Sequence, residues 1–395
     1  MKIRLIGALA ALLAIGLAAS IWTLGATWSP SLPGDADVAD GRSMIVARRL
    51  PESPIIRHTM DARLRDEARR YGYVNVNGPS LIRVPQWVES RLGEYYLYFA
   101  HHKGEFIRMA YADRLSGPWT LYAPGVLDLD VSLFTSQAPE SAGLPRSALD
   151  LWHATTLTEF IALSQVGLSA QRALQARKRS GLAGSDETRP HIASPDVGVD
   201  HERREIRMYF HGLVERRLQM TRVATSPDGL HFRAWPELLT APYLRVFEHR
   251  AARYGLAMPG LLYRSADGLS GFRVRDRPLF AANTRHAAVW VRKDTLYVFY
   301  TRVGDTPERI LCSTIDATSS DWDEWVPSPP FEILRPELPW EGADLPVEPS
   351  VRGESTVPVR QLRDPAIFVE DNQAYLLYSV AGEQAIAIAQ LTVPD

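Results

Sequence analysis

The side chains best suited to acid–base and binding chemistry stand at the starts of apolar, strand-like runs far apart in the chain. They are Asn75 and Asn77, His191 and Asp196, Arg245, Arg285 and His286, and Arg363 and Asp364. One such residue often only forms the turn before a strand. The same placement in five runs predicts that these side chains meet in one site, where the carboxyl groups of Asp196 and Asp364 could transfer protons.

A site of this kind needs an architecture that brings strand starts to one point. Five units of short β-branched and aromatic strands follow one another, with turn residues between them. Their opening strands are expected at 79–84, 194–197, 243–247, 284–289 and 362–368. A repeated four-stranded meander is typical of a β-propeller. We therefore predict an all-β, five-bladed β-propeller over residues 71–395, with a β-sandwich, single or double, as the alternative fold.

Three segments fall outside this pattern. Lys2 and Arg4 precede the apolar run 5–19, so residues 1–26 are expected to be a signal peptide. The run extends to Leu24, close to the ~20 residues that span a bilayer, and a membrane anchor is the alternative. Residues 27–70 are expected to be a linker with a short charged helix at 59–70. Residues 147–180 predict one or two inserted helices, which either cover the propeller mouth or pack against it.

Composition excludes several classes of protein. Hydrophobic residues make up 46% and charged residues 23% of the 395-residue chain, and the net charge of −2 gives no basic face for nucleic acid. The single cysteine, Cys312, excludes an intrachain disulfide and a cysteine-based metal site. The sequence contains no Gly-rich phosphate loop, no Gly-x-Ser-x-Gly elbow and no His-Glu-x-x-His motif. No cofactor is expected, and a structural calcium ion on the propeller axis is left open.

Four short motifs carry a family resemblance. Ser194-Pro195-Asp196, the turn 226–232, Arg285-His286 and Arg363-Asp364-Pro365 occur in an order that resembles the five-bladed glycoside hydrolases of families 43, 32, 62 and 117. The resemblance spans residues 75–393 and implies cleavage of glycosidic bonds on a propeller. In that group a first-blade acidic residue is base or nucleophile, a second aspartate tunes the acid, and a glutamate is usually the acid. Family 117 is thought to use a histidine as the acid instead.

The sequence departs from the group at the start of its first blade. Asn77-Gly78-Pro79 stands where those enzymes usually have Asp before Pro. Neither asparagine nor glycine provides a carboxylate base. Either the base lies elsewhere, with Asp364 the best candidate, or the propeller does not hydrolyse glycosides.

Glycoside hydrolysis needs one protonated and one ionised group across the scissile bond. We expect Asp364 to be base or nucleophile, Asp196 the second axial carboxylate, and Glu341 the acid, with Glu248 and Glu308 as rivals to Glu341. A neighbouring Arg363 would favour the ionised form of Asp364. The residues expected to bind substrate are Asn77, His102, Lys103, His191, His211, Arg245, Arg285, His286, Glu308, Trp340 and Arg363. No His pair has helical metal-site spacing, and no metal ligand is assigned.

These features predict an exported glycoside hydrolase that cleaves an oligo- or polysaccharide, located in the periplasm, secreted, or anchored by its N-terminus. Its partner is a carbohydrate and not nucleic acid, and any membrane contact is through the N-terminal segment. A non-catalytic, glycan-binding propeller is the alternative that the missing first-blade aspartate favours. Arg245, Arg285 and Arg363 keep a sugar lyase or phosphorylase open as a third reading.

Overall fold

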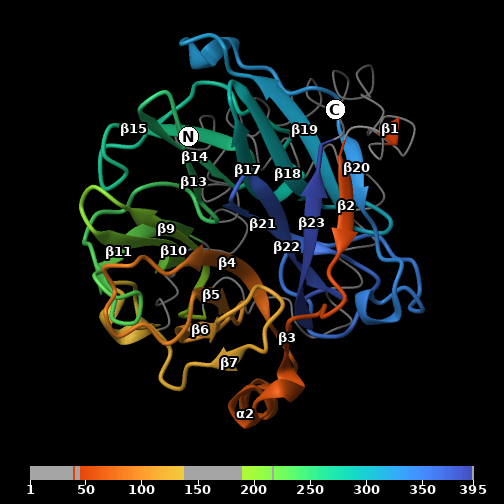
Figure 1. The fold of residues 1–395 in the computed structure, drawn as a ribbon. Helices are drawn as coiled ribbons and strands as arrows, with labels where there is room; N and C mark the ends of the chain where they lie inside the picture. The colour runs from red at the N-terminus through yellow and green to blue at the C-terminus, as the bar shows by residue number, and fades with distance from the viewer. Residues whose placement is uncertain (1–38, 41–44, 138–188, 216–217, 394–395) are drawn as a thin grey trace, which may run out of the picture.

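The computed structural model describes residues 39–40, 45–137, 189–215 and 218–393. Within them, five sheets of four or five strands surround a common centre (Figure 1). First strands of different blades contact one another: β4 (Asn77–Arg83) contacts β9 (Ile192–Asp200), and β17 (Thr284–Arg292) contacts β21 (Arg363–Glu370). The predicted all-β, five-bladed propeller is therefore confirmed.

Each blade is a meander whose first strand lies innermost. Blades one and two consist of β4, β5 (Tyr95–Ala100), β6 (Phe106–Ala112) and β7 (Thr120–Leu121), and of β9, β10 (Glu205–Glu215), β11 (Leu218–Ser226) and β12 (Arg233–Ala234). Blades three and four consist of β13 (Arg245–His249), β14 (Ala252–Ala257), β15 (Leu261–Ser265) and β16 (Arg273–Val274), and of β17, β18 (Thr295–Arg302), β19 (Ile310–Asp316) and β20 (Phe331–Leu334). A short strand, β8 (Leu127–Asp128), also pairs with β6.

Blade five joins the two ends of the described chain. Its strands are β21, β22 (Gln373–Val380), β23 (Ala385–Thr392) and, outermost, β2 (Val46–Arg49). The strand β2 pairs antiparallel with β23, and a second short strand, β3 (Ile56–Arg57), pairs with the start of β23. The ring is thus closed by hydrogen bonds within one sheet. The strand β2, from the N-terminal part of the chain, thus belongs to the same blade as the C-terminal strands.

Local turn chemistry explains the tight hairpin between β21 and β22. Glu370 pairs with Gln373, which leaves a two-residue turn of Asp371 and Asn372 with φ of 48° and 62°. Left-handed residues at both central positions match the right-handed twist of the strands. Asp and Asn tolerate this conformation better than other residues with a side chain.

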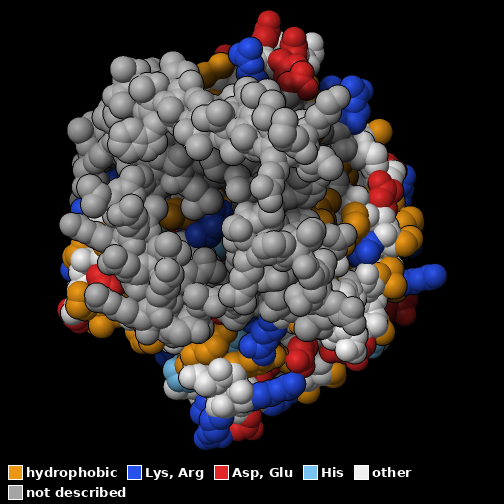
Figure 2. Space-filling model, turned by 180° about the vertical axis from the view of Figure 1, so that it is seen from behind, with side chains coloured by type: hydrophobic (Ala, Val, Ile, Leu, Met, Phe, Trp, Pro, Cys, Tyr) orange, Lys and Arg blue, Asp and Glu red, His pale blue; other side chains and the backbone are white. Residues whose placement is uncertain are grey.

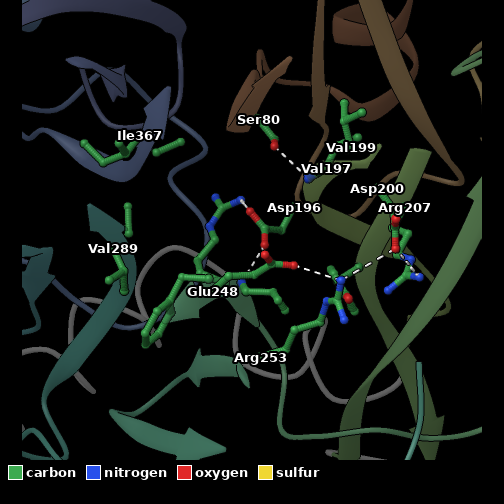
Figure 3. Close-up of a pocket in the computed structure, with 17 residues that line it drawn as sticks. Ser80, Asp196, Val197, Val199, Asp200, Arg207, Glu248, Arg253, Val289 and Ile367 are labelled. Atoms are coloured by element: carbon green, nitrogen blue, oxygen red, sulfur yellow. Dashed lines mark hydrogen bonds and ion pairs between the residues drawn. The ribbon is translucent and has the colours of Figure 1, made fainter. Parts of the chain in front are cut away.

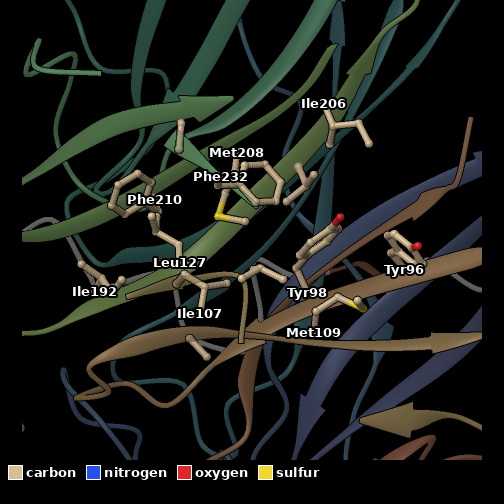
Figure 4. Close-up of a cluster of buried hydrophobic side chains, with 14 of the residues drawn as sticks. Tyr96, Tyr98, Ile107, Met109, Leu127, Ile192, Ile206, Met208, Phe210 and Phe232 are labelled. Carbon is tan, nitrogen blue, oxygen red and sulfur yellow. The ribbon is translucent and has the colours of Figure 1, made fainter. Parts of the chain in front are cut away.

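Apolar side chains fill the space between adjacent blades. Tyr96 and Tyr98 of β5 lie in one buried cluster with Met208 and Phe210 of β10 (Figure 4). Burial of a large apolar side chain contributes about 1.5–3 kcal/mol. This cluster therefore joins blade one to blade two over most of the length of their second strands.

Two Ser-x-Asp-Gly turns add a polar link between neighbouring blades. Asp228 accepts hydrogen bonds from the backbone N–H groups of Leu230 and His231, at 2.8 and 3.0 Å. This fixes the turn so that the carbonyl oxygen of Gly229 accepts a 2.9 Å bond from the hydroxyl of Tyr98 in blade one.

The second turn repeats this arrangement one blade further on. Asp267 accepts from the N–H groups of Leu269 and Ser270, and the carbonyl oxygen of Gly268 accepts a 2.8 Å bond from Tyr209 of blade two. The two turns therefore connect blade one to two and blade two to three.

In blade four the 3-10 helix η5 (Trp322–Glu324) precedes β20. The N-terminal part of the described chain differs from the sequence-based expectation. Within the stretch expected to be a linker, β1 (Ala39–Asp40) pairs with β20, and β2 is a blade strand. The helix α2 (Ala62–Tyr71) lies where a short charged helix was expected.

The expected signal or anchor at 1–26 and the expected helical insertion at 147–180 lie outside the described residues. Among the residues that the structure does describe, no helix has the length and apolar character needed to cross a membrane.

We expect that replacing Tyr98 with Phe lowers the free energy of unfolding by about 1–3 kcal/mol, because the buried carbonyl of Gly229 loses its hydrogen-bond donor. Urea unfolding at 25 °C would measure the loss. Tyr297→Phe, at a half-buried tyrosine of β18, is the control, with an expected change within about 0.5 kcal/mol. Equal stability of Tyr98→Phe and the unchanged protein would show that the turn does not link the blades.

Candidate active site

The inner strands begin with an irregular step that breaks the normal alternation of side chains. Gly78, Ser194 and Asp364 each precede a proline and have φ of 61°, 50° and 50°. The pairing register also shifts at these points, between Asn77 and Ser80 in blade one and between Arg363 and Ala366 in blade five. Such bulges re-aim side chains. Consecutive residues can therefore both enter the same site.

Gly78 is the position of blade one that matches Asp364 of blade five. A Cβ atom on Gly78 would lie 3.1 Å from the Cα atom of Ser194, and the positive φ adds strain for any side chain. The carboxylate that the sequence resemblance would place before this proline is therefore absent from blade one. In this protein the aspartate before a proline at an inner strand start belongs to blade five.

A buried set of charged and polar groups lies where the inner strands begin, and we call it the axial cluster. It contains three carboxylates among two arginines, two histidines and a tyrosine: Asp364, Glu308, Glu383, Arg285, Arg363, His102, His286 and Tyr243. Each of these residues is less than one-tenth exposed. All five blades except blade two supply a member.

Asp364 forms a pair with His286 of blade four. Its Oδ1 atom contacts the Nδ1 atom of His286, and its Oδ2 atom accepts a 3.0 Å bond from the hydroxyl of Ser379. Burial would raise the pKa of Asp364, but the charge and hydrogen bond of His286 hold that pKa below its ordinary value. Burial lowers the pKa of His286, and Asp364 offsets only part of the effect. The pair is therefore a carboxylate beside a neutral imidazole near pH 7.

Glu383 pairs with a second histidine, His102, whose pKa is shifted in the direction opposite to that of His286. Its carboxylate accepts hydrogen bonds from Asn75 at 2.5 Å, Asn77 at 3.0 Å and Arg363 at 2.9 Å, and lies 3.4 Å from Nδ1 of His102. Burial would raise the pKa of Glu383, but His102 and Arg363 hold it well below its ordinary value. Burial also opposes the charge on His102, yet Glu383 raises the pKa of His102 above its ordinary value.

Tyr243 connects the two histidines. Its hydroxyl lies 3.2 Å from Nε2 of His102, and its ring centroid lies 4.3 Å from the ring of His286 and 4.2 Å from that of His211. Tyr243 has a φ of 61° in the loop before β13. Blade three therefore contributes an aromatic hydroxyl at the position where other blades contribute charge.

Glu308 lies between the two arginines of the axial cluster. Glu308 accepts a 2.7 Å bond from Thr301 and lies 3.2 Å from Arg285 and from Arg363. Arg285 also donates to the carbonyl oxygens of Val351 and Gly353, both at 3.0 Å. Since Glu308 is held between two guanidinium groups, its contacts are those of a counter-ion that fixes Arg285 and Arg363.

Asp196 lies beside a separate cavity and not among the groups of the axial cluster. It accepts a 2.7 Å bond from the N–H of Val246 and lies 3.3 Å from Arg245 (Figure 3). The cavity has a volume of about 250 Å³ and reaches Asp200 and Glu248, which lie at or near the ends of β9 and β13. It therefore extends toward the end of the inner strands opposite the axial cluster.

The charges around this cavity are largely paired with one another. Burial raises the pKa of Asp196, and Arg245 offsets part of the effect. Arg253 lies 2.9 Å from Glu248 and 3.6 Å from Asp200, and Arg207 lies 2.7 Å from Asp200 (Figure 3). Glu248, a rival candidate for the acid, is exposed at the cavity and forms an ion pair with Arg253.

Glu341, expected to be the acid, has a structural role instead. Arg49 donates to it at 2.7 and 2.9 Å, and the backbone N–H of Glu337 donates at 2.8 Å. It also accepts from the hydroxyl of Tyr378 at 3.1 Å. Glu341 ends the 3-10 helix η6 (Pro339–Glu341) and links it to β2 and β22 of blade five. Its neighbour Trp340 packs on the core of blades four and five. Neither side chain contacts the axial cluster.

Sequence reasoning placed Asn75 at a strand start but missed Glu383 and Tyr243. A usable signal existed for Glu383, because His102 follows the second strand of blade one just as Glu383 follows the second strand of blade five. Glu308 has the same place in blade four, after β18. Polar residues after second strands therefore reach the same end of the axis as residues at first-strand starts.

Lys103, His191 and His211 are also buried near this end of the axis, at the side of blades one and two. The rings of His191 and His211 lie 5.8 Å apart. Within the described residues, no group of three or more His, Cys, Asp or Glu side chains has a geometry that could hold a metal ion.

We expect that Glu341→Gln lowers the free energy of unfolding by about 1–3 kcal/mol, because the charge-assisted bonds from Arg49 are weakened. Thermal and urea unfolding would measure this loss. Activity per folded molecule should stay unchanged in an assay of hydrolysis. A variant with full stability and no activity would return Glu341 to the position of catalytic acid.

Comparison with known proteins gives one close sequence relative. No family model matches the chain. The uncharacterized protein R118 of Acanthamoeba polyphaga mimivirus is 31% identical over 368 residues, which cover 87% of this chain and 89% of that protein.

The solved structures similar to this chain have low identity. The GH43 β-xylosidase/α-arabinofuranosidase CoXyl43 from a compost microbial metagenome, in complex with xylotriose, is 12% identical, with a TM-score of 0.48, and covers 88% of this chain and 95% of its own. The GH43_1 enzyme of Xanthomonas citri is 12% identical, with a TM-score of 0.46, and covers 81% and 88%. The exo-β-1,3-galactanase of Phanerochaete chrysosporium, with β-1,3-galactotriose, is 10% identical, with a TM-score of 0.45, and covers 82% and 61%.

The five blades of this protein are defined by its own strand pairings, and its family is defined by the sequence match. The chain belongs to the same protein family as the mimivirus protein R118.

Proposed function

We propose that this protein is a glycoside hydrolase that cleaves an oligo- or polysaccharide at the axial cluster. One observation carries the proposal: two buried histidine–carboxylate pairs lie around Tyr243, and the pKa values of the two histidines are shifted in opposite directions. Paired groups whose environments separate their pKa values are the mark of an acid and a base in one site. The carbohydrate substrate is proposed from the motifs at inner strand starts.

His102 is the proposed acid. Glu383 stabilises its protonated form, and Nε2 of His102 points its proton toward the hydroxyl of Tyr243, 3.2 Å away. The hydroxyl can accept this proton while passing its own to the glycosidic oxygen of a bound substrate. A proton delivered to this oxygen lets the leaving sugar depart as a neutral alcohol.

The proposed base is His286 together with Asp364. Asp364 contacts Nδ1 of His286 and so favours the tautomer whose Nε2 atom is free to accept a proton. A water molecule that attacks the anomeric carbon gives its proton to this atom. Asp364 stabilises the imidazolium that forms. This assignment keeps Asp364 in the catalytic site and replaces Glu341 by His102 with Glu383.

Arg285 and Arg363 have a supporting role in the proposal. Both form ion pairs with Glu308, Arg363 lowers the pKa of Glu383, and Arg285 lowers the pKa of Asp364. Because all these groups are buried, the site is pre-organised, and its charges act through a low effective dielectric constant.

Export is part of the proposal. The charged start and apolar run of residues 1–26 support a signal peptide or an N-terminal anchor, with the propeller in the periplasm or outside the cell. Cell fractionation of the full chain, with and without residues 1–26, tests this.

We expect Asp364→Asn, His286→Gln and His102→Gln each to reduce kcat/KM by about 10²–10⁴-fold, the usual contribution of a general acid or base. Hydrolysis would be followed on a panel of aryl furanosides, aryl pyranosides and polysaccharides. Asp196→Asn is the matched control, because Asp196 lies at the separate cavity, and it should keep activity within a few-fold.

Two results would overturn this assignment. Activity that survives in Asp364→Asn but is lost in Asp196→Asn would move the chemistry to the cavity. Glycan binding with no hydrolysis of any substrate would favour the non-catalytic propeller, for which Gly78 at the first-blade position is the supporting observation.

The pH dependence of kcat/KM should be bell-shaped. His286 must be neutral, and its pKa is below the ordinary value of 6.5, so activity is lost as pH falls through that lowered pKa. His102 must be protonated, and its pKa is above 6.5, so activity is lost as pH rises through that raised pKa. The residual activity of His102→Gln should lack the alkaline limb. A single rising limb in the unchanged protein would contradict the proposal.

A further inference from the structure

Three nitrogen-bearing side chains lie beside the proposed catalytic groups and take no part in the mechanism. His211 is in β10, His191 directly precedes β9, and Lys103 follows His102 after β5. Exposure is at most 1% for each of the three side chains. The backbone N–H of Ile192 donates a 3.0 Å bond to the carbonyl oxygen of Gly104, which holds the turn with Lys103 against the start of β9. We call these three residues the basic group.

The titratable neighbours that act on His211 are all basic side chains. Its neighbours in electrostatic contact are His191, His102, Lys103 and His286, and together with burial they lower the pKa of His211 well below its ordinary value. The three carboxylates of the axial cluster come from blades four and five and are already paired with His286, His102, Arg285 and Arg363. His211 therefore lies where its basic neighbours disfavour a further positive charge and would favour an anion.

His211 also has unused hydrogen-bonding capacity. Among the described residues, no hydrogen-bond partner meets its Nδ1 or its Nε2 atom, although the side chain is 1% exposed. A buried polar atom without a partner costs about 1–3 kcal/mol. A neutral imidazole donates one hydrogen bond and accepts another, so a bound ligand group could satisfy it.

The position of the basic group relates it to the substrate. The ring of Tyr243 lies 4.2 Å from that of His211 and 4.3 Å from that of His286, in tilted contacts, so a sugar that reaches the catalytic pair also comes close to His211. In the view from behind, blue Lys or Arg atoms are visible near the middle of the molecule (Figure 2). An anion brought to this place would gain both charge compensation and hydrogen bonds.

We propose that Lys103, His191 and His211 bind an anionic substituent of the sugar, so that the substrate is an acidic glycan. The substituent is either the carboxylate of a uronic acid or a sulfate ester, since both present oxygen acceptors with negative charge. This inference rests on the proposed function for the identity of the ligand as a sugar. It adds that the substrate carries a negatively charged group, which the basic group binds and which a neutral sugar lacks.

Binding of matched monosaccharides to the full chain tests the proposal without any need for turnover. Galacturonate, galactose 6-sulfate and galactose would be compared by isothermal titration calorimetry, with glucuronate, glucose 6-sulfate and glucose as a second series. We expect at least one acidic sugar to bind about tenfold or more tightly than its neutral counterpart, the effect of one charge-assisted hydrogen bond. The preference should persist in about 1 M salt, where exposed charges are screened within ~3 Å.

Two variants locate the preference. Lys103→Met and His211→Asn should each reduce the affinity for the acidic sugar about tenfold or more, with little change for the neutral one. Lys293→Met is the matched control, because Lys293 is an exposed lysine in the hairpin between β17 and β18, and it should keep the preference. If Lys103→Met does not fold, the proposal is still tested by His211→Asn and by the comparison of sugars on the unchanged protein.

Equal binding of acidic and neutral sugars, or no binding of any acidic sugar, would overturn the proposal. So would a preference that remains in both variants. These outcomes are separate from failure of the proposed function, which is a loss of hydrolysis and not of selective binding. A uronate preference without a sulfate preference, or the reverse, identifies which anion the basic group binds.

Discussion

Three carboxylates are buried on one axis, and each must be compensated by cations or hydrogen-bond donors. The rest of the structure is arranged around this requirement. An uncompensated charge in a protein interior costs several kcal/mol, and removal of one partner from a buried pair costs about 3–5 kcal/mol. Asp364, Glu308 and Glu383 come from blades four and five, while His102 and Asn77 come from blade one. No single blade supplies enough cationic and hydrogen-bonding side chains to compensate all three carboxylates. The charge balance is therefore reached only when the blades form a closed ring.

The same balance gives the histidines their different states. His102 sits beside a carboxylate that two amides and an arginine also bind, and it remains favoured in its protonated form. His286 faces Asp364 and the guanidinium of Arg285, and burial prevails over the carboxylate. The balance between burial and the paired carboxylate thus decides which histidine keeps its proton. A network that stabilises the fold in this way also separates an acid from a base.

The repeated meanders allowed the propeller to be predicted, because five apolar strand starts with polar residues need a common axis. The predicted residues Asp364, His286, His102, Arg285, Arg363, Asn77 and Glu308 are brought together. Glu341 was chosen because a glutamate beside tryptophan has the composition of a sugar site, whereas the structure surrounds it with Arg49 and Tyr378 from distant strands, away from the axial cluster. Glu383 was missed because its hairpin carries no local motif. Only the ring places it against residues some 300 positions away.

Closure of blade five by β2 has a consequence for the order of events during synthesis. The strand β2 leaves the ribosome first but finds its partner, β23, only when the chain is almost complete. Asp364 and Glu383 are made in that same final portion. A nascent chain can therefore build its early blades while it still lacks these two carboxylates. The last strands both seal the ring and deliver the acidic groups, so a truncated product would be incomplete in architecture and chemistry alike.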